Sequence, residues 1–550
     1  MKLFSFPNAK MSLGSGGVIL SQPTRSEPES TDLGHPEMEE DIRKLCAEVL
    51  GRSISRVKLE RSFVAQGGDS LMAIKLMARC RTKGYTINVQ DLLQSASIRE
   101  FCQCVKPKQT SETAAGNTSA HTISQDNHHD VAPGPPSVEI PITEVDTSRL
   151  NLVTPNPNDG IESVFPCSAT QEVFLAAQSV HPEKYHVTAV LEFSSNKSSM
   201  PLDAKLLSEA WEQLVKYHAA LRTVFIDSKT RPGHFDQVVF KTAITKLHIL
   251  DDRACSPEEF ALRTPVAFPN YQATHNAAIY RHQNQQMILF RLDISHALAD
   301  GESISILLRD LQDLYFHPVR PLPPPMQYQT FVSHQLSLSS TTATSYWSTY
   351  LTQAEPSFFP VQNQAEISIG TDLTASVPLR IPTDPGALST LCEKLNITTA
   401  NICQLAWGLV LRAYTASEDV CFSYANSGRH VPLGGIENAV GSFADTLIFR
   451  MRIGSDDMTV GDALGTAKRD FLKGMGVPSG LLVMDTSEDG GAAAREFARC
   501  RGNTLLSCQR GWDLGNGDSG KKSGFGVRLV DAVNPNEVCI CVLFRRRERL

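Results

Sequence analysis

A polar segment divides this chain into two parts, and it limits the fold more than any other feature. From Lys106 to about Gly160 the sequence is rich in Thr, Ser, Asn, Pro and His, and it contains no aromatic residue. Such a segment cannot bury enough apolar surface to offset the entropy of ordering its backbone. The sequence therefore predicts a flexible linker over residues 107–160. Its His128 and His129 have no further ligands at metal-binding spacing, so we expect a solvated linker rather than a metal site.

The composition argues against several classes of protein. The 52 Lys and Arg are outnumbered by 59 Asp and Glu, a formal net charge of −7, so the basic excess typical of nucleic-acid binding is missing. No uncharged apolar stretch is long enough for a membrane span. The 13 Cys show no disulfide or zinc-ribbon spacing, and we expect reduced thiols and a cytoplasmic location. Residues 1–35, rich in Ser, Pro and Gly, are expected to form a disordered tail.

The first folded part is predicted to be a small all-α bundle over residues 36–106. Apolar side chains recur with helical spacing over residues 42–50, and Gly51 is expected to end that helix in a left-handed conformation. A second helix is predicted to begin at Ser70 and a third after Ser97, which has capping-box spacing.

One serine of this bundle stands where a phosphate group can be accommodated. In FVAQGGDSLMAIKL, Gly67 and Gly68 allow a tight turn ahead of Ser70, which lies at the first turn of the second helix. A helix N-terminus offers free N–H groups and a positive dipole end to a phosphate on the serine oxygen. The alternative interpretation is a plain helix start with Asp69 or Ser70 as the N-cap.

The part after residue 160 is predicted to be mixed α/β. Residues 288–294 alternate between apolar and less apolar side chains, as a strand does, and residues 304–311 then have helical spacing. A helix through residues 402–411 and a strand through residues 420–424 form a second pair.

A histidine follows the first of these strands. In SHALADG, His296 stands at a strand end, from which an imidazole of near-neutral pKa can reach into a cleft and accept or position a proton. Asp300 follows shortly after, and Gly301 is expected to permit the turn into the next helix. The alternative is a packed histidine without a chemical role.

The bundle resembles the carrier, or thiolation, domain of non-ribosomal peptide synthetases, through its length and its FxxxGGDSL spacing. The resemblance implies that Ser70 receives 4′-phosphopantetheine from a phosphopantetheinyl transferase, and that the thiol of this group holds an acyl or peptidyl thioester. No stretch resembles an adenylation domain or a P-loop, so upstream synthetase modules, with adenylation in trans, are expected to supply the peptidyl group.

The second part resembles a fungal-type terminal condensation domain, because several strings occur in the expected order. They are SVFPCSATQEVFLAAQ, YHAALRTVF, SHALADG, YWSTYL and SGRHVPLGGIENAVGSFADTLIFR. The resemblance implies two chloramphenicol-acetyltransferase-like lobes in a V, residues 161–335 and 336–550, with a tunnel between them. It also implies that His296 is catalytic, and that Arg222 and Asp300 form a salt bridge that holds its loop.

The sequence departs from that family at several places. Ser295 stands where a first histidine is common, which fits the terminal class, and Asp445 stands where asparagine is usual. Residues 471–503 match nothing expected between the lobes. The likeness also stops early, near the basic run from Arg545 to Arg547, which is expected to be a solvated terminus. The C-terminal lobe is therefore expected to be shortened, with an unpaired sheet edge.

The implied function is acyl transfer from a carrier thioester to an amine, which forms an amide bond and releases or cyclises a peptide. No metal is needed, and neither nucleic acid nor a membrane is an expected partner. Two alternatives stay open: a carrier with a non-catalytic docking domain, and a stand-alone acyltransferase that uses acyl-CoA. The attached carrier argues against the second, because a soluble donor does not need one.

Overall fold

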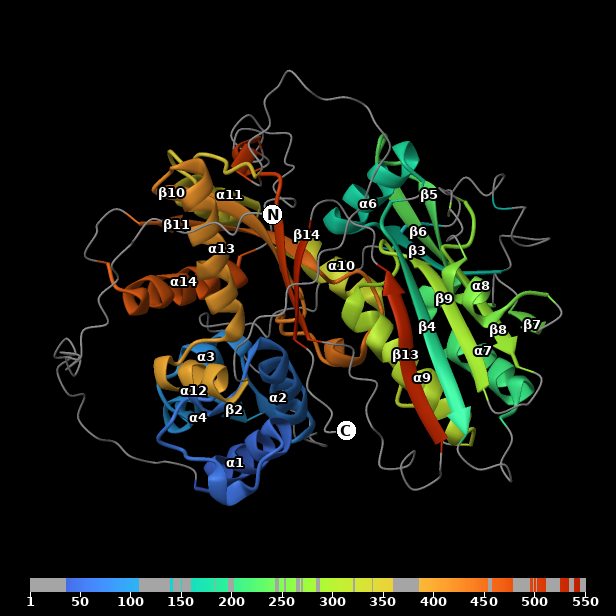
Figure 1. Ribbon diagram of the computed structural model, residues 1–550, viewed down its shortest axis with the longest axis horizontal. Helices are drawn as coiled ribbons and strands as arrows, with labels where there is room; N and C mark the ends of the chain where they lie inside the picture. Colours follow the sequence, from blue (N-terminus) through green and yellow to red (C-terminus); the bar gives the residue numbers. More distant parts are fainter. Residues whose placement is uncertain are drawn as a thin grey trace, which may run out of the picture.

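The computed structural model describes residues 36–107, 139–141 and 150, and residues 160–544 with internal gaps (Figure 1). The widest of these gaps are residues 360–384, 478–494 and 511–524. The predicted tail, most of the predicted linker and the basic run at the C-terminus lie outside the described residues. Within the described ranges, no helix has both the length and the apolar character needed to span a membrane.

Within residues 36–107, which are described without a gap, four α-helices form a bundle. Gly51 has φ +63° directly after the first helix, as expected, and the Ser97 hydroxyl accepts a hydrogen bond from the Glu100 N–H at 3.0 Å to begin the last. Helix α3 (Val89–Gln94) was not predicted, because its six residues are too few to show a helical period. The helices are α1 (Pro36–Leu50), α2 (Ser70–Thr82), α3 (Val89–Gln94) and α4 (Ile98–Cys104), with 3-10 turns η1 (Ile54–Arg56) and η2 (Val64–Gln66) and a short ribbon of β1 (Tyr85–Thr86) and β2 (Lys106–Pro107).

The N-terminal lobe of the second domain is built on two sheets. Its described strands form a 5-stranded sheet of order β13-β4-β9-β8-β7 and a 3-stranded sheet of order β3-β6-β5. Helices α7 and α9 pack their apolar sides on the larger sheet, around Trp211 and Phe290. The elements are β3 (Ile161–Pro166), α6 (Ala169–Val180), β4 (His186–Ser195), α7 (Ala204–Tyr217), η5 (Ala219–Arg222), β5 (Thr223–Asp227), β6 (Phe235–Phe240), β7 (His248–Asp251), α8 (Pro257–Leu262), β8 (His275–Arg281), β9 (Met287–Ser295), α9 (Gly301–Phe316) and α10 (Tyr328–Ser337). Elements β9 and α9 confirm the strand and helix predicted on either side of the histidine motif.

The C-terminal lobe contains a sheet of order β11-β10-β12-β14 among the described strands. Strands β10 and β11 are antiparallel, whereas β10–β12 and β12–β14 are parallel. The elements are α11 (Ser340–Tyr350), α12 (Pro385–Leu395), α13 (Thr399–Thr415), β10 (Asp419–Asn426), η6 (Ile436–Asn438), β11 (Asp445–Arg452), α14 (Val460–Met475), β12 (Leu505–Arg510), β13 (Phe525–Val533) and β14 (Cys539–Phe544). The predicted helix and strand at residues 402–411 and 420–424 are confirmed as α13 and β10.

Strand β13 leaves the C-terminal lobe and joins the sheet of the N-terminal lobe. It pairs antiparallel with β4, from Phe525 opposite Ser195 to Val533 opposite Thr188 (Figure 1). Because β4 also pairs with β9, it has a neighbour on both sides. The two lobes therefore share this sheet, while the unpaired edge expected from a shortened C-terminal lobe stays a prediction.

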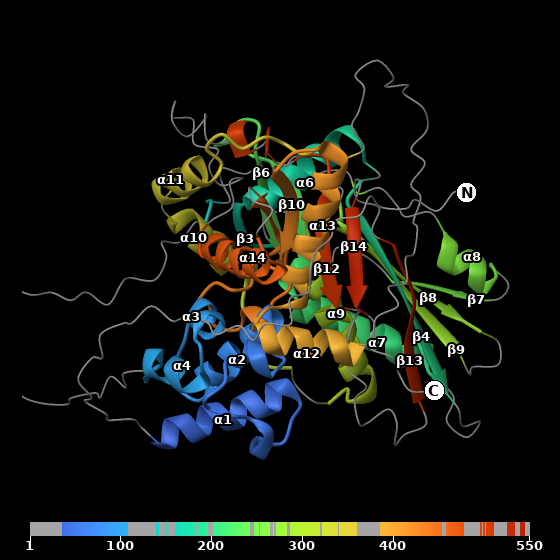
Figure 2. The same ribbon diagram turned by 60° about the vertical axis from the view of Figure 1, so that its left-hand side comes forward.

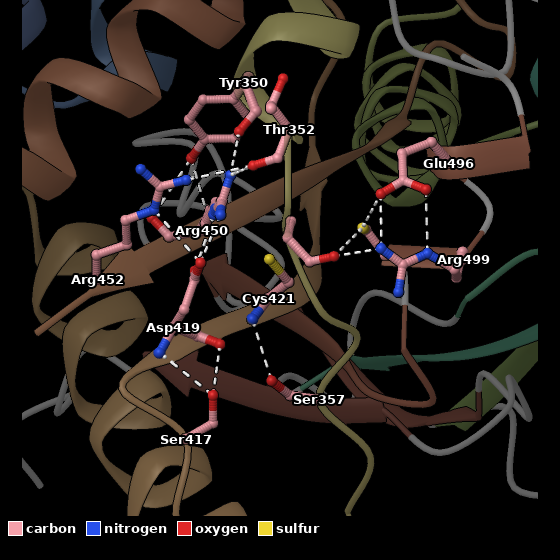
Figure 3. A network of polar contacts seen from close by, with 12 residues as sticks. Tyr350, Thr352, Ser357, Ser417, Asp419, Cys421, Arg450, Arg452, Glu496 and Arg499 are labelled. Atoms are coloured by element: carbon pink, nitrogen blue, oxygen red, sulfur yellow. Dashed lines mark hydrogen bonds and ion pairs between the residues drawn. The ribbon is translucent and has the colours of Figure 1, made fainter. Parts of the chain in front are cut away.

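Residues 471–503 do not match the resembled family, and the end of this stretch packs into the C-terminal lobe. Phe497 is 1% exposed, and its ring lies 4.9 Å from that of Trp347 on α11, edge to face. Arg499 pairs with Glu496 and donates to the carbonyl of Ala354 (Figure 3). These contacts show that residues around 497 belong to the lobe and are not an insertion outside it.

A second set of polar contacts ties the segment after α11 to the neighbouring sheet. Arg450 on β11 pairs with Asp419 on β10, and it donates to the carbonyls of Tyr350 at 2.7 Å and Thr352 at 2.9 Å (Figure 3). One guanidinium therefore joins two strands and the end of a helix, which fits its low exposure of 5%.

The carrier bundle packs against the C-terminal lobe, where its helices lie beside α12 and below α14 in both Figure 1 and Figure 2. Arg52 pairs with Glu393 on α12 at 3.0 Å, and the Gln90 side chain donates to the carbonyl of Leu472 on α14 at 3.2 Å. Apolar side chains of both parts form one continuous core. The structure therefore places the carrier on the domain it is expected to serve.

Candidate active site and carrier attachment site

The turn before Ser70 has the geometry that the sequence predicts. Gly67 has φ +90°, a conformation that favours glycine. A Cβ on Gly68 would lie 2.3 Å from the Phe63 ring, so only glycine fits against that side chain. Helix α2 then begins at Ser70, with Asp69 as its N-cap: the Asp69 carboxylate accepts from the Met72 N–H at 2.9 Å.

This arrangement fits a phosphopantetheine group on Ser70. Asp69 makes the capping hydrogen bond, so the cap does not depend on the serine hydroxyl. The positive dipole end at the α2 N-terminus suits a phosphate attached next to it. The side chain of Ser70 itself lies outside what the structure describes.

His296 lies at the end of β9, in the loop that leads to α9. Its backbone N–H donates to the carbonyl of Tyr185 at 2.7 Å, and its ring lies 4.8 Å from that of Phe174. The residue is 9% exposed, while its Nδ1 is buried and has no hydrogen-bond partner among the described residues. Burial lowers the pKa of His296, and the Asp300 carboxylate opposes that shift in part. The imidazole is therefore neutral at pH 7.

Ser295, where the family often has a histidine, anchors this loop. It is fully buried, and its hydroxyl exchanges hydrogen bonds of 3.1 and 3.2 Å with the Gln178 amide. It also accepts the Ala297 N–H at 3.2 Å. The serine thus has a structural role beside His296, and Gln178 is a supporting residue that sequence reasoning missed.

Asp300 pairs with an arginine of the other lobe, not with Arg222. Its carboxylate lies 3.0 Å from Arg429, which follows β10, and both residues are buried. It also accepts the N–H groups of Ser303, Phe443 and Ala444, at 2.7, 3.1 and 3.2 Å. Both carboxylate oxygens of Asp300 therefore accept hydrogen bonds from fixed donors. Asp300 therefore caps α9 and holds the loop 427–444 against it, and it is not a second base.

Arg222 holds a different part of the N-terminal lobe, so the expected salt bridge between Arg222 and Asp300 is wrong. Its guanidinium pairs with Glu162 on β3 and donates to the carbonyls of Phe240 on β6 and of Val215 on α7. The physical reason is position: Arg222 precedes β5 and lies over the 3-stranded sheet, with its acceptors on the neighbouring strands and helix.

Gly301 does not have the role the sequence predicted. It is the first residue of α9, it has no positive φ, and a Cβ there would meet no atom within 4 Å. The turn therefore does not require glycine, and open space lies beside this residue.

A small cavity of about 30 Å³ adjoins the histidine loop. It lies between the two lobes, and its lining includes Gln171, His218, Leu298, Tyr328 and Gly441. Leu298 belongs to the loop of His296, but His296 is not among the described residues that line this cavity.

Comparisons with known proteins agree with this architecture. The family described as "Condensation domain" matches residues 161–496, and "Phosphopantetheine attachment site" matches residues 40–105. Nonribosomal peptide synthetase cm3A of Cordyceps militaris is 37% identical over 479 residues, which are 86% of this chain and 10% of that protein. Nonribosomal peptide synthetase easA of Emericella nidulans is 39% identical over 408 residues, 73% of this chain and 5% of that protein. The chain spans a tenth or less of these relatives.

Solved structures share the fold. The complex of the X-domain and OxyB from teicoplanin biosynthesis matches with a TM-score of 0.55 at 17% identity, over 70% of this chain and 84% of that chain. A structure titled "The crystal structure of CT" matches with a TM-score of 0.50 at 20% identity, over 70% and 82% of the two chains.

The fold and the site together define a phosphopantetheine carrier domain joined to a two-lobed condensation domain. The chain belongs to the condensation domain family of nonribosomal peptide synthetases, and its carrier holds 4′-phosphopantetheine covalently on a serine. The predicted carrier domain and condensation domain are both confirmed.

Proposed function

We propose that this chain transfers a peptidyl group from its carrier to an amine and thereby releases the peptide, in cyclic form where the amine belongs to the same peptide. The observation that carries the proposal is the state of His296: a neutral imidazole at a strand end, in a loop fixed from both lobes, on the domain against which the carrier packs. Ser70 is the proposed attachment residue.

Phosphopantetheine on Ser70 supplies a thiol that holds the peptidyl group as an activated thioester. Nε2 of His296 accepts the proton of the attacking amine as the carbon–nitrogen bond forms and the carbon–sulfur bond breaks, and it returns that proton to the departing sulfur. Asp300 and Arg429 keep the loop in place and do not touch the substrate. Holding both reactants on one chain replaces a collision in solution with a local encounter.

The proposal also assigns partners and a location. A phosphopantetheinyl transferase adds the group to Ser70. Upstream synthetase modules load the peptide, with adenylation supplied in trans, and the chain works in the cytoplasm.

A second candidate function is a non-catalytic carrier and docking module. The low exposure of His296 and its absence from the cavity lining favour this candidate. The test is to load the chain with a peptidyl-phosphopantetheine and identify released products by mass spectrometry. Release that depends on His296 supports the enzyme. A folded, loaded chain that releases nothing supports the docking module.

A further inference from the structure

Arg429, which pairs with Asp300, also fixes the backbone of its own loop, residues 427–444. Arg429 donates to the carbonyls of Ile436 at 2.6 Å and Ala439 at 2.9 Å, in addition to its bond to Asp300. It is wholly buried, and its guanidinium lies 4.1 Å from the centre of the Phe443 ring. The backbone around η6 and the carboxylate beside His296 are therefore held by one rigid group.

The carrier contacts this same loop. Arg81 of α2 donates to the carbonyl of Leu433 at 2.5 Å, and α2 packs next to η6. The half-buried Arg81 is also attracted by Glu437 of η6, which partly opposes the lowering of the Arg81 pKa by burial. A cation that is removed from water against one carbonyl and one nearby carboxylate has a specific partner and is not a solvated surface charge.

Arg81 lies on the helix that begins with the attachment residue. Ser70 is the first residue of α2 and Arg81 is next to its last, a separation of about 16 Å along a rigid helix. Two contacts therefore meet at residues 427–444: the end of the carrier helix through Leu433, and the catalytic loop through Arg429 and Asp300.

We propose that Arg81 is a docking and positioning residue, through which the seated carrier fixes the loop 427–444 and thereby the Asp300 carboxylate and His296. This inference rests on the proposed function, because its kinetic test measures peptide release. Its consequence is that the histidine is best positioned for catalysis when the carrier is docked, so the condensation domain responds to the presence of its carrier as well as to the thioester.

The kinetic test compares two substrates in the full chain. One is the peptidyl group loaded on the carrier, and the other is a soluble peptidyl-pantetheine thioester given to the chain without phosphopantetheine. Arg81→Ala is expected to lower kcat for both substrates, by about fivefold for the soluble one, because the loop loses its contact even when no arm is involved. Arg81→Lys, which keeps a positively charged donor group, is expected to restore part of the loss. Arg79→Ala is the matched control, since Arg79 lies on the same helix and pairs with Glu48 within the carrier.

A second measurement does not depend on turnover. Amide hydrogen exchange of the peptide that covers residues 427–444 is expected to be faster in Arg81→Ala than in wild type and Arg79→Ala. Unchanged exchange there, or unchanged kcat for the soluble thioester, would overturn the coupling and leave Arg81 at most a docking contact. If wild type releases no product from either substrate, the proposed function fails, while the exchange measurement still decides whether Arg81 fixes the loop.

Discussion

Asp300 and Arg429 form a buried ion pair of 3.0 Å that joins the two lobes beside the candidate catalytic histidine. Each member of the pair also has backbone partners, which hold it in position. Such a pair adds little net stability compared with apolar residues, but removal of one member leaves an uncompensated charge. The pair therefore determines how the lobes fit together at the loop of His296.

Asp300→Asn is expected to destabilise the condensation domain by about 3 kcal/mol, measured from urea unfolding at pH 7. Asparagine can still cap α9, so the loss reports the uncompensated Arg429 guanidinium. Asp203→Asn is the matched control, because Asp203 is an exposed N-cap of α7 and asparagine caps equally well there. If both variants unfold at the same urea concentration as wild type, the ion pair does not hold the lobes.

Ser70→Ala is expected to abolish modification of the chain by a phosphopantetheinyl transferase and CoA. Wild type should gain the mass of one phosphopantetheine, as measured on the intact protein. Ser53→Ala, an exposed serine before η1, should be modified like wild type. Modification of the Ser70 variant would mean that another residue receives the group.

The sequence predicts best the features that depend on neighbours along the chain. The GGDS turn, the α2 start and the order of strand, histidine and helix around His296 all follow from spacing within a few residues. The partner of Asp300 does not, because Arg429 lies 129 residues away and no local pattern connects the two. Arg429 stands in the SGRH string that supports the resemblance, yet a single sequence gives no sign of what it contacts.

Two other features depend on long-range pairing. Strand β13 joins β4 across more than 300 residues of chain, and its alternation alone cannot select that neighbour. The packing of Phe497 was also missed, because the Gly- and Ala-rich residues before it hide a single buried aromatic. In both cases the tertiary partner, and not the local pattern, decides the structure.

His296→Ala is expected to reduce the rate of peptide release by about 10²- to 10⁴-fold, which is the usual contribution of a general base. In wild type the rate should rise with pH through a pKa below 6.5 and then stay level from pH 7 to 8, because burial lowers the pKa of His296 and the neutral form is the active one. Single-turnover release from the loaded carrier measures this step. His317→Ala, at the exposed end of α9, should retain the wild-type rate and profile. A release rate that increases toward acid pH would contradict the assignment.

Phe497→Ala is expected to lower the stability of the C-terminal lobe by about 3 to 5 kcal/mol, because the ring is buried against Trp347. Tryptophan fluorescence during urea unfolding measures the loss. Phe358→Ala is the control, since that ring is 45% exposed. A loss in Phe497→Ala no larger than that of the control would show that residues around 497 do not contribute to the lobe.

The stability of the N-terminal lobe is expected to fall as the pH drops from 6.5 toward 4, in part through His275. This residue is 1% exposed, and burial lowers its pKa to about 4. In the unfolded chain a histidine takes up a proton near pH 6.5, so between these values the unfolded state binds more protons than the folded one, and the free energy of unfolding decreases with falling pH. The contribution of His275 to this decrease in the free energy of unfolding approaches about 3 kcal/mol at pH 4. His275→Phe should therefore lose less stability than wild type between pH 7 and pH 4.5 in urea unfolding, whereas His317→Ala should follow wild type. A His275→Phe variant with the wild-type acid dependence would show that this histidine is protonated in the fold.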